Sequence, residues 1–262
     1  MSTLVIQSHT HPLPYQWLER CIESVRKWSD ENQFDYQWIG DELFGLINPK
    51  IMDKVGEQKV IATDLARLYA LKEGLETHDR VVWLDADFLI FSPEKFLLPN
   101  PENLPLKYMV GREVWVQQDQ QYPSKLKCYV KVHNAFLMFD RGNSFLDFYI
   151  EHAEKLLSEC EGPMPPQFIG PKLLTAIRNV IGCPVLETAG MLCPEVINDL
   201  LSENGRNDAL ELFLNKSKVY PAGANLCISS VHRKDISHQQ LVSLIDLLIN
   251  GYKNGRKYIP EY

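Results

Sequence analysis

Two aspartates interrupt an apolar segment, and they are the residues of this chain most able to do chemistry. In RVVWLDADFLIF, residues 80–91, Asp85 and Asp87 are spaced i, i+2 between two apolar runs. Side chains two apart on a strand share a face, so both carboxylates point the same way if the strand continues. Two carboxylates about 5 Å apart repel by roughly 3 kcal/mol at an effective dielectric near 20. A proton or a hard divalent cation such as Mg²⁺ or Mn²⁺ relieves that repulsion.

The same Asp-Ala-Asp segment has a simpler interpretation. Aspartates often end strands, where their side chains stabilise solvated turns. Here the motif follows one strongly apolar run and precedes another. That context favours a site for a metal ion and a diphosphate over a turn.

Four other residues could join such a site. Asp64 and Arg67 are spaced i, i+3 on a helix predicted for residues 60–75; the alternative is a surface salt bridge worth about 0.5 kcal/mol. Trp83 shares the face of Asp85 and either packs in the core or forms an aromatic wall for a ribose or base. Asn134 begins a predicted strand and either offers its amide to sugar hydroxyls or caps a turn.

Polar residues also lie at two other predicted strand ends. Gln7 and Ser8 end a strand over residues 3–8, at the edge where α/β sheets bind ligands. His9 and His11 follow with a spacing that permits metal binding, although a polar loop is the interpretation we prefer. His232 ends a segment, SSVH, that we expect to be extended; a lone histidine is more often not a metal ligand.

The order of the predicted elements indicates an α/β fold. Residues 3–40 are expected to form a strand, a helix and a second strand, and this β-α-β order is typical of a parallel sheet. Further strands are predicted at 103–116 and 132–140, separated by a polar segment, 117–129, that we expect to be a loop. Further helices are predicted at 145–159, 172–182 and 238–253. No shift in composition marks a boundary, which favours one domain over residues 1–262.

Composition narrows the class of partner. The 262 residues carry a formal net charge of −7 with dispersed lysines and arginines, which argues against nucleic acid as the main partner. The six cysteines form no C-x-x-C pair, so we expect free thiols and a cytoplasmic location. The N-terminal residues do not resemble a signal peptide, and no run of about 18 apolar residues predicts a membrane span. A peripheral membrane contact stays open.

Several of these segments resemble retaining glycosyltransferases of the GT-A fold. HDRVVWLDADFLIFSP is similar to the D-x-D segment of the glycogenin and lipopolysaccharide galactosyltransferase group. ATDLARLYALKEG and FIGPKLLTAI resemble the "DXD sugar-binding region" group, which includes the yeast initiating mannosyltransferase, and VHNAFLMFDRGNSFLDFY is similar to both groups. The resemblance covers roughly residues 3–235. It implies a Rossmann-like, mostly parallel central sheet flanked by helices.

The resemblance also implies roles for the metal ligands. Asp85 and Asp87 would hold Mn²⁺ or Mg²⁺ against the diphosphate of a nucleotide-sugar. His232 is similar to a late histidine that completes the metal site in the glycogenin group.

The donor-binding roles rest on the same resemblance. Asp64 and Arg67 would hold sugar hydroxyls and the phosphate side of the donor. Trp83 would lie beside the nucleoside, and Asn134 would face the transferred sugar.

The implied reaction moves a sugar from a UDP- or GDP-sugar to a hydroxyl of a glycan, lipid-linked or protein acceptor, with retention of configuration. A D-x-D phosphatase is one alternative, but such enzymes carry the motif on their first strand. A nucleotidyltransferase would need a glycine-rich, basic loop after the first strand, where this chain has QSHTHPLP. A catalytically inactive nucleotide-sugar-binding module stays open.

Overall fold

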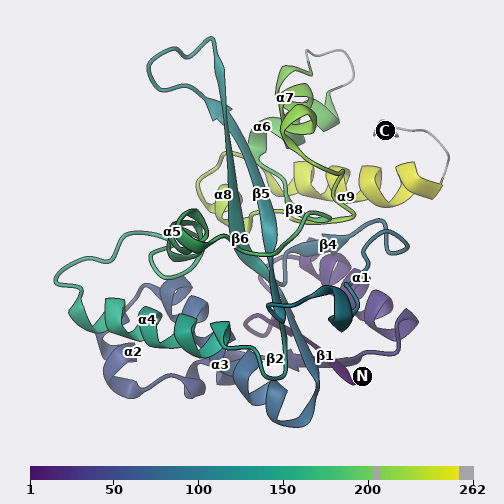
Figure 1. The fold of residues 1–262 in the computed structure, drawn as a ribbon. Helices are drawn as coiled ribbons and strands as arrows, with labels where there is room; N and C mark the ends of the chain where they lie inside the picture. Colours follow the sequence, from purple (N-terminus) through teal and green to yellow (C-terminus); the bar gives the residue numbers. More distant parts are fainter. Residues whose placement is uncertain (203–206, 254–262) are drawn as a thin grey trace.

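The computed structural model describes residues 1–202 and 207–253 of the chain. They form an α/β fold around a six-stranded sheet with strand order β2-β1-β3-β6-β5-β7 (Figure 1). The strands of this sheet are β1 Thr3–Ser8, β2 Asp35–Ile39, β3 Arg80–Leu84, β5 Tyr108–Gln118, β6 Leu126–Asp140 and β7 Val185–Leu186. The predicted class, a central sheet flanked by helices, is confirmed.

Strand directions in this sheet are mixed. β1 is parallel to both β2 and β3, and β7 is parallel to β5. β6 runs antiparallel to β3 on one side and to β5 on the other. Among the described residues, three of the five strand pairs are therefore parallel, and the carboxyl ends of β1 and β3 meet at one edge, where ligands bind in α/β sheets.

Helices cover both faces of the sheet because alternate residues of its strands are apolar on both sides. Val81 and Trp83 of β3 belong to the core beneath α3, whereas Val82 and Leu84 belong to the core beneath α1. Figure 1 shows α1 on one side of the sheet and α2, α3 and α4 on the other. The bounds are α1 Trp17–Glu31, α2 Pro49–Val55, α3 Lys59–Thr77, α4 Phe145–Glu159 and α5 Pro171–Ile181, with 3₁₀ helices at Asp41–Leu46 and Pro101–Asn103.

A smaller sheet lies beside the first, with strand order β4-β9-β8. Its strands are β4 Phe88–Ile90, β8 Ala189–Met191 and β9 Gly223–Asn225. The helices that follow β8 and β9 in the chain are α6 Pro194–Leu201, α7 Asp208–Lys216, α8 Ile228–His232 and α9 His238–Lys253. A second apolar core joins α1 to α6 and α9, so this smaller unit packs against the first.

Three local predictions are wrong. Residues 126–129 were expected in a loop but belong to β6, because their backbone pairs with β5 despite their polar composition. SSVH is helical rather than extended and lies in α8. α3 ends at Thr77, three residues beyond the predicted stop at Gly74, since Gly74 packs tightly against Val81 inside the helix.

Among the described residues, no helix is long and apolar enough to cross a bilayer. The single-domain prediction for residues 1–262 stays a prediction, since residues 203–206 and 254–262 lie outside the described part of the chain.

Candidate active site

The Asp-Ala-Asp segment forms a tight turn between β3 and β4. The Phe88 N–H donates to the Asp85 carbonyl at 2.9 Å, and the Asp85 N–H donates to the Ala135 carbonyl of β6 at 3.0 Å. β3 ends at Leu84 and β4 begins at Phe88, so the strand does not continue through the motif and the condition for a shared strand face is not met. The turn instead sends the two side chains to different partners.

The Asp85 carboxylate accepts hydrogen bonds from a cation and an indole. Its Oδ1 accepts hydrogen bonds from Arg67 Nη1 at 2.9 Å and from Trp83 Nε1 at 2.7 Å. Its side chain is 25% exposed. Asp85 is therefore the carboxylate of the pair that a ligand could reach.

Asp87 is buried and has neutral donors. Its Oδ1 accepts from Asn225 Nδ2 at 2.6 Å and its Oδ2 from the Ile228 N–H at 2.8 Å. Burial, followed by the negative charge of Asp85, raises the pKa of Asp87 to about 6, although these hydrogen bonds oppose the rise. The second carboxylate is held in place by the fold without a neutralising charge of its own.

Arg67 lies at the centre of the site. It is only 5% exposed, which overturns the interpretation of Asp64 and Arg67 as a surface salt bridge. Its Nη2 lies 3.2 Å from Asp64 Oδ1, and its Nη1 donates to Asp85 and, at 2.8 Å, to the Asn134 carbonyl. Its guanidinium also lies over the Trp83 ring, 5.2 Å from the centroid. One buried cation thus joins α3, β3 and β6.

Asp64 carries an oxygen with no partner. Its Oδ1 accepts from Asn134 Nδ2 at 2.7 Å, whereas its Oδ2 is buried without a hydrogen bond. Burial raises the pKa of Asp64, and Arg67 opposes the rise. A Cβ at Gly170, just before α5, would lie 2.4 Å from Asp64 Oδ2. Only glycine lets the chain pass this close, and an orphaned carboxylate oxygen is suited to accept a hydrogen bond from a ligand hydroxyl.

An irregularity in β6 aims Asn134 at this site. Val110 of β5 pairs with Leu137, but the next residue, Gly111, pairs with His133, so residues 134–136 have no partner in β5. Such bulges bend a strand and redirect side chains. Here the bulge turns the Asn134 side chain toward Asp64.

His133 holds the bulge from inside. It is fully buried, its Nδ1 accepts from the Ala135 N–H at 3.1 Å, and its Nε2 lies 3.2 Å from the Ala189 carbonyl. The proton is therefore on Nε2, and burial lowers the pKa of the ring to about 4. A Cβ at Gly111 would lie 2.1 Å from the ring, so the glycine makes room for it. The sequence prediction missed this pair, although His133 directly precedes Asn134.

Two predicted donor-binding residues are internal. Gln7 is fully buried, donates to the Asp85 carbonyl at 3.1 Å and accepts from the Tyr36 hydroxyl at 3.0 Å. Trp83 is 1% exposed, which favours core packing over an aromatic wall for the nucleoside. Both residues act on the position of Asp85. Ser8 is half-buried at the end of β1.

His9 lies near His232 and near Asp85. His232 is exposed at the end of α8, with its ring 6.3 Å from that of Tyr15. His9 is half-buried and its Nδ1 has no hydrogen-bond partner; burial lowers its pKa, which the charge of Asp85 raises and that of His232 lowers. Within residues 1–202 and 207–253, no group of three or more His, Cys, Asp or Glu side chains could hold a metal ion by itself. The role of His232 stays a prediction.

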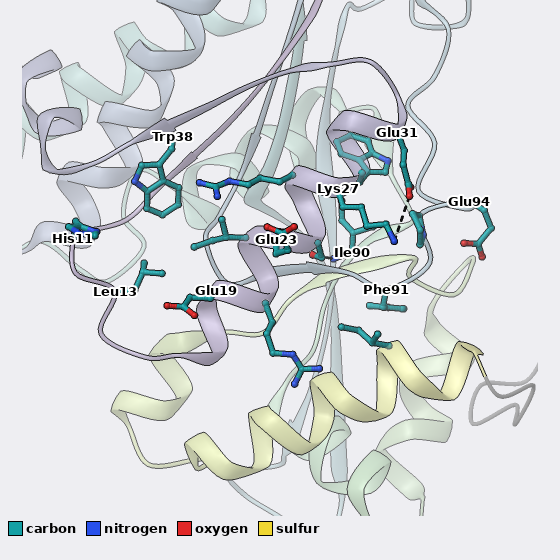
Figure 2. Close-up of a pocket in the computed structure, with 17 residues that line it drawn as sticks. His11, Leu13, Glu19, Glu23, Lys27, Glu31, Trp38, Ile90, Phe91 and Glu94 are labelled. Atoms are coloured by element: carbon teal, nitrogen blue, oxygen red, sulfur yellow. Dashed lines mark hydrogen bonds and ion pairs between the residues drawn. The ribbon is translucent and has the colours of Figure 1, made fainter.

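A groove of about 1020 Å³ runs beside α1, but it is a different feature (Figure 2). Figure 2 shows His11, Leu13 and Trp38 on one side of α1 and Phe91 and Glu94 on the other. The residues that line the groove do not include Asp85, Asp87 or Arg67. Its mixed acidic and basic lining shows no convergence of polar groups.

Comparison with known proteins gives distant similarities only. No family model matches the chain, and no curated protein matches it. Among solved structures, 92% of the chain is similar to 99% of a glycosyltransferase involved in the glycosylation of the major capsid of PBCV-1, at 12% identity and a TM-score of 0.48. It is similar over 87% of its length to 98% of mouse xyloside xylosyltransferase 1, at 12% identity and a TM-score of 0.44.

A third similar structure is a 4-diphosphocytidyl-2C-methyl-D-erythritol synthase from Anaerococcus prevotii. It matches 71% of this chain and 86% of its own, at 13% identity and a TM-score of 0.37. At these TM-scores none of the three similarities decides the function.

Proposed function

We propose that this chain is a metal-dependent glycosyltransferase of GT-A type that transfers a sugar from a nucleotide-sugar to an acceptor hydroxyl. The observation that carries the proposal is the buried Arg67, which joins Asp64, Asp85 and the Asn134 carbonyl at the carboxyl end of β3. A buried ion network at that edge of an α/β sheet is costly to build, and such networks cluster at functional sites.

The turn carboxylates fit a divalent cation by their chemistry. Asp87 is buried with neutral donors, and burial and the charge of Asp85 raise its pKa to about 6, so a nearby cation would favour its ionised form. Mg²⁺ in enzymes is usually held by one or two carboxylates together with substrate phosphates, so Asp85, Asp87 and a diphosphate form a suitable set. When bound, the ion would stabilise the negative charge of the departing diphosphate.

The buried carboxylate of Asp64 fits a sugar hydroxyl. Its Oδ2 needs a donor, and Asn134 and Arg67 already hold its Oδ1. A sugar hydroxyl donating to Oδ2 would satisfy that atom, with Gly170 as the adjacent wall.

We extend the proposal to retention of configuration. The bond between the anomeric carbon and the diphosphate oxygen breaks, and the acceptor oxygen bonds to that carbon on the same face. The acceptor proton passes to the departing diphosphate, so the protein supplies position rather than a nucleophile. Arg67 would orient Asp85 and Asp64 throughout. The donor classes we propose are UDP- and GDP-sugars; the acceptor is a glycan, a lipid-linked sugar or a protein, met in the cytoplasm.

The test is a panel of UDP- and GDP-sugars, each with Mn²⁺ or with EDTA, followed by thermal shift and by hydrolysis. A ligand at about 100 times its Kd stabilises by about 2.7 kcal/mol, which is visible as a shift. We expect one donor to stabilise the protein and to be hydrolysed only with Mn²⁺. Asp64→Asn should lower kcat/KM per folded molecule at least tenfold, whereas Asp147→Asn, at an exposed side chain of α4, should not.

Two outcomes would oppose the proposal. Stabilisation by a donor without hydrolysis or transfer would favour the inactive binding module. Neither stabilisation nor turnover with any donor would contradict a nucleotide-sugar site. A phosphatase is not favoured by the fold, because the D-x-D turn follows β3 rather than the first strand.

A further inference from the structure

The hairpin of β5 and β6 extends well beyond the sheet to which these strands belong (Figure 1). Residues 113–118 pair with 126–131, and residues 119–125 form the tip; we call residues 113–131 the arm. Asp119 orders the tip, because its Oδ1 accepts from the Gln121 and Tyr122 N–H groups at 2.8 and 3.2 Å. The arm is therefore a built projection with a defined shape.

Three lysines of the arm gather on its tyrosines. Lys125 lies over the Tyr122 ring at 5.1 Å from the centroid, and Lys127 and Lys131 lie over the Tyr129 ring at 5.5 and 5.1 Å. The arm carries these three lysines and two acids, Asp119 and Glu113, and the Glu113 carboxylate lies 3.8 Å from Lys131 Nζ. This segment is positive on a chain whose net charge is −7.

Apolar groups are exposed on the same arm. Tyr122 at the tip is 57% exposed and Val130 is 40% exposed. A fourth lysine, Lys216 at the exposed end of α7, also lies near the arm, since burial raises the pKa of Cys128 and the charge of Lys216 opposes that rise. The exposed Tyr122 lies beside Lys125, so the tip of the arm is amphipathic, whereas Val130 lies on the strand face opposite Lys127 and Lys131.

The positions of the lysines and tyrosines on the arm favour one class of ligand over two others. The face of Tyr129 is covered by Lys127 and Lys131, so it is not free to stack on a sugar. Nucleic acid is disfavoured by the small number of lysines and by the acidic remainder of the chain. An anionic bilayer fits, since lysines bind its headgroups while their stems and tyrosine rings lie at the interface.

We propose that the arm docks on a membrane surface that contains anionic lipid. The contact uses the lysine ammonium groups at the headgroups and Tyr122 at the interface. β6 continues from Lys127 to Asn134, about 23 Å at 3.3 Å per residue, so a docked arm would hold the candidate site near lipid-linked acceptors. Only that last consequence rests on the proposed function.

The test is flotation of the full chain with vesicles, without donor or metal. One vesicle is pure phosphatidylcholine and the other contains 30% phosphatidylglycerol. We expect binding to the anionic vesicle to be at least tenfold tighter and to weaken at high salt. The triple variant Lys125→Gln, Lys127→Gln, Lys131→Gln should lose at least tenfold in affinity.

A matched triple variant removes the same charge elsewhere. Lys27, Lys72 and Lys155 lie on α1, α3 and α4 and are 55–69% exposed; their replacement by Gln should change affinity less than twofold. Tyr122→Ser should weaken binding without any change in charge. Equal losses in the two triple variants, no preference for anionic vesicles, or equally tight binding to soluble poly-glutamate would overturn the proposal. Vesicle binding proceeds without turnover, so an inactive protein could still confirm it.

Discussion

Asp85 and Asp87 are separated by one alanine, yet the fold surrounds them differently. Asp85 accepts hydrogen bonds from a buried guanidinium and an indole and is one-quarter exposed. Asp87 accepts from an amide and a backbone N–H and is 6% exposed, and burial raises its pKa to about 6. The difference teaches that neighbouring carboxylates can be held in different ways: Asp85 is paired with Arg67, whereas Asp87 is held by an amide and a backbone N–H with no cation among its hydrogen-bond donors.

The largest loss of stability is expected when Arg67, the buried cation beside Asp85, is removed. Arg67→Met leaves Asp64 and Asp85 without their buried cation, and breaking a buried pair in this way costs about 3–5 kcal/mol. The measurement is urea unfolding at pH 7.5 with EDTA. The control is Lys72→Met on the same helix, whose pair with Asp147 is exposed and worth less than about 1 kcal/mol. Equal losses in the two variants would mean that Arg67 behaves as a surface residue.

A smaller effect is expected from the bulge that supports Arg67. Gly111→Ala places a Cβ 2.1 Å from the His133 ring, so the ring must move and its bonds to Ala135 and Ala189 weaken. Overpacking of this kind costs about 1–3 kcal/mol. Unfolding is compared with that of Gly45→Ala, a position with no atom within 4 Å of the added Cβ. A Gly111→Ala variant as stable as the control would show that the bulge tolerates the displacement.

Much of this fold could be predicted from the sequence. Apolar periodicity predicts β1, α1, β2 and β3, and the i, i+3 spacing of Asp64 and Arg67 places both on one helix face. Burial of that pair could not be predicted, because it depends on a bulge in β6 that lies about 70 residues later. Residues 126–129 are polar, so their side chains do not predict a strand. They belong to β6 because their backbone groups pair with β5.

The direction in which each aspartate side chain points also could not be predicted from the sequence. A strand pattern predicts that residues 85 and 87 share a face, but the Phe88 N–H closes a turn and separates them. Asn225, the partner of Asp87, lies 138 residues away. His133 was missed because one histidine beside an asparagine gives no signal until Gly111 is placed opposite it.

The smallest effect concerns the pH dependence of Asp87. Its pKa is about 6 in the folded protein and about 3.9 in an unfolded chain. Between these values the folded state holds more protons, so the stability of the metal-free protein falls as pH rises from 4 to 6. His133 acts oppositely, because its pKa is lowered to about 4 from about 6.5 when unfolded, and stability rises over nearly the same range.

Because these two contributions oppose each other, the informative quantity is the difference between a variant and the parent. Asp87→Asn removes this pH-dependent loss of stability. The free energy of unfolding of the variant should therefore rise, relative to that of the parent, between pH 4 and pH 6. The gain should be about 2 kcal/mol or less, since a change of one in pKa is worth about 1.4 kcal/mol and the range from pH 4 to pH 6 spans most of the change. Hydrogen bonds lost in the variant lower its stability at both pH values and so do not change this difference. Urea unfolding with EDTA at both pH values measures it; a difference that is flat or of opposite sign would show that Asp87 is ionised without penalty.

The most direct test of the central claim is calorimetric titration of UDP and GDP into the parent and Asp87→Asn, each with Mn²⁺ and with EDTA. If the turn carboxylates hold a cation against a diphosphate, the parent should bind one nucleotide at least tenfold more tightly with Mn²⁺. Asp87→Asn should lose that gain while unfolding at the parent's urea concentration or above. Equally tight binding with EDTA, or an undiminished Mn²⁺ gain in a folded Asp87→Asn variant, would contradict the account.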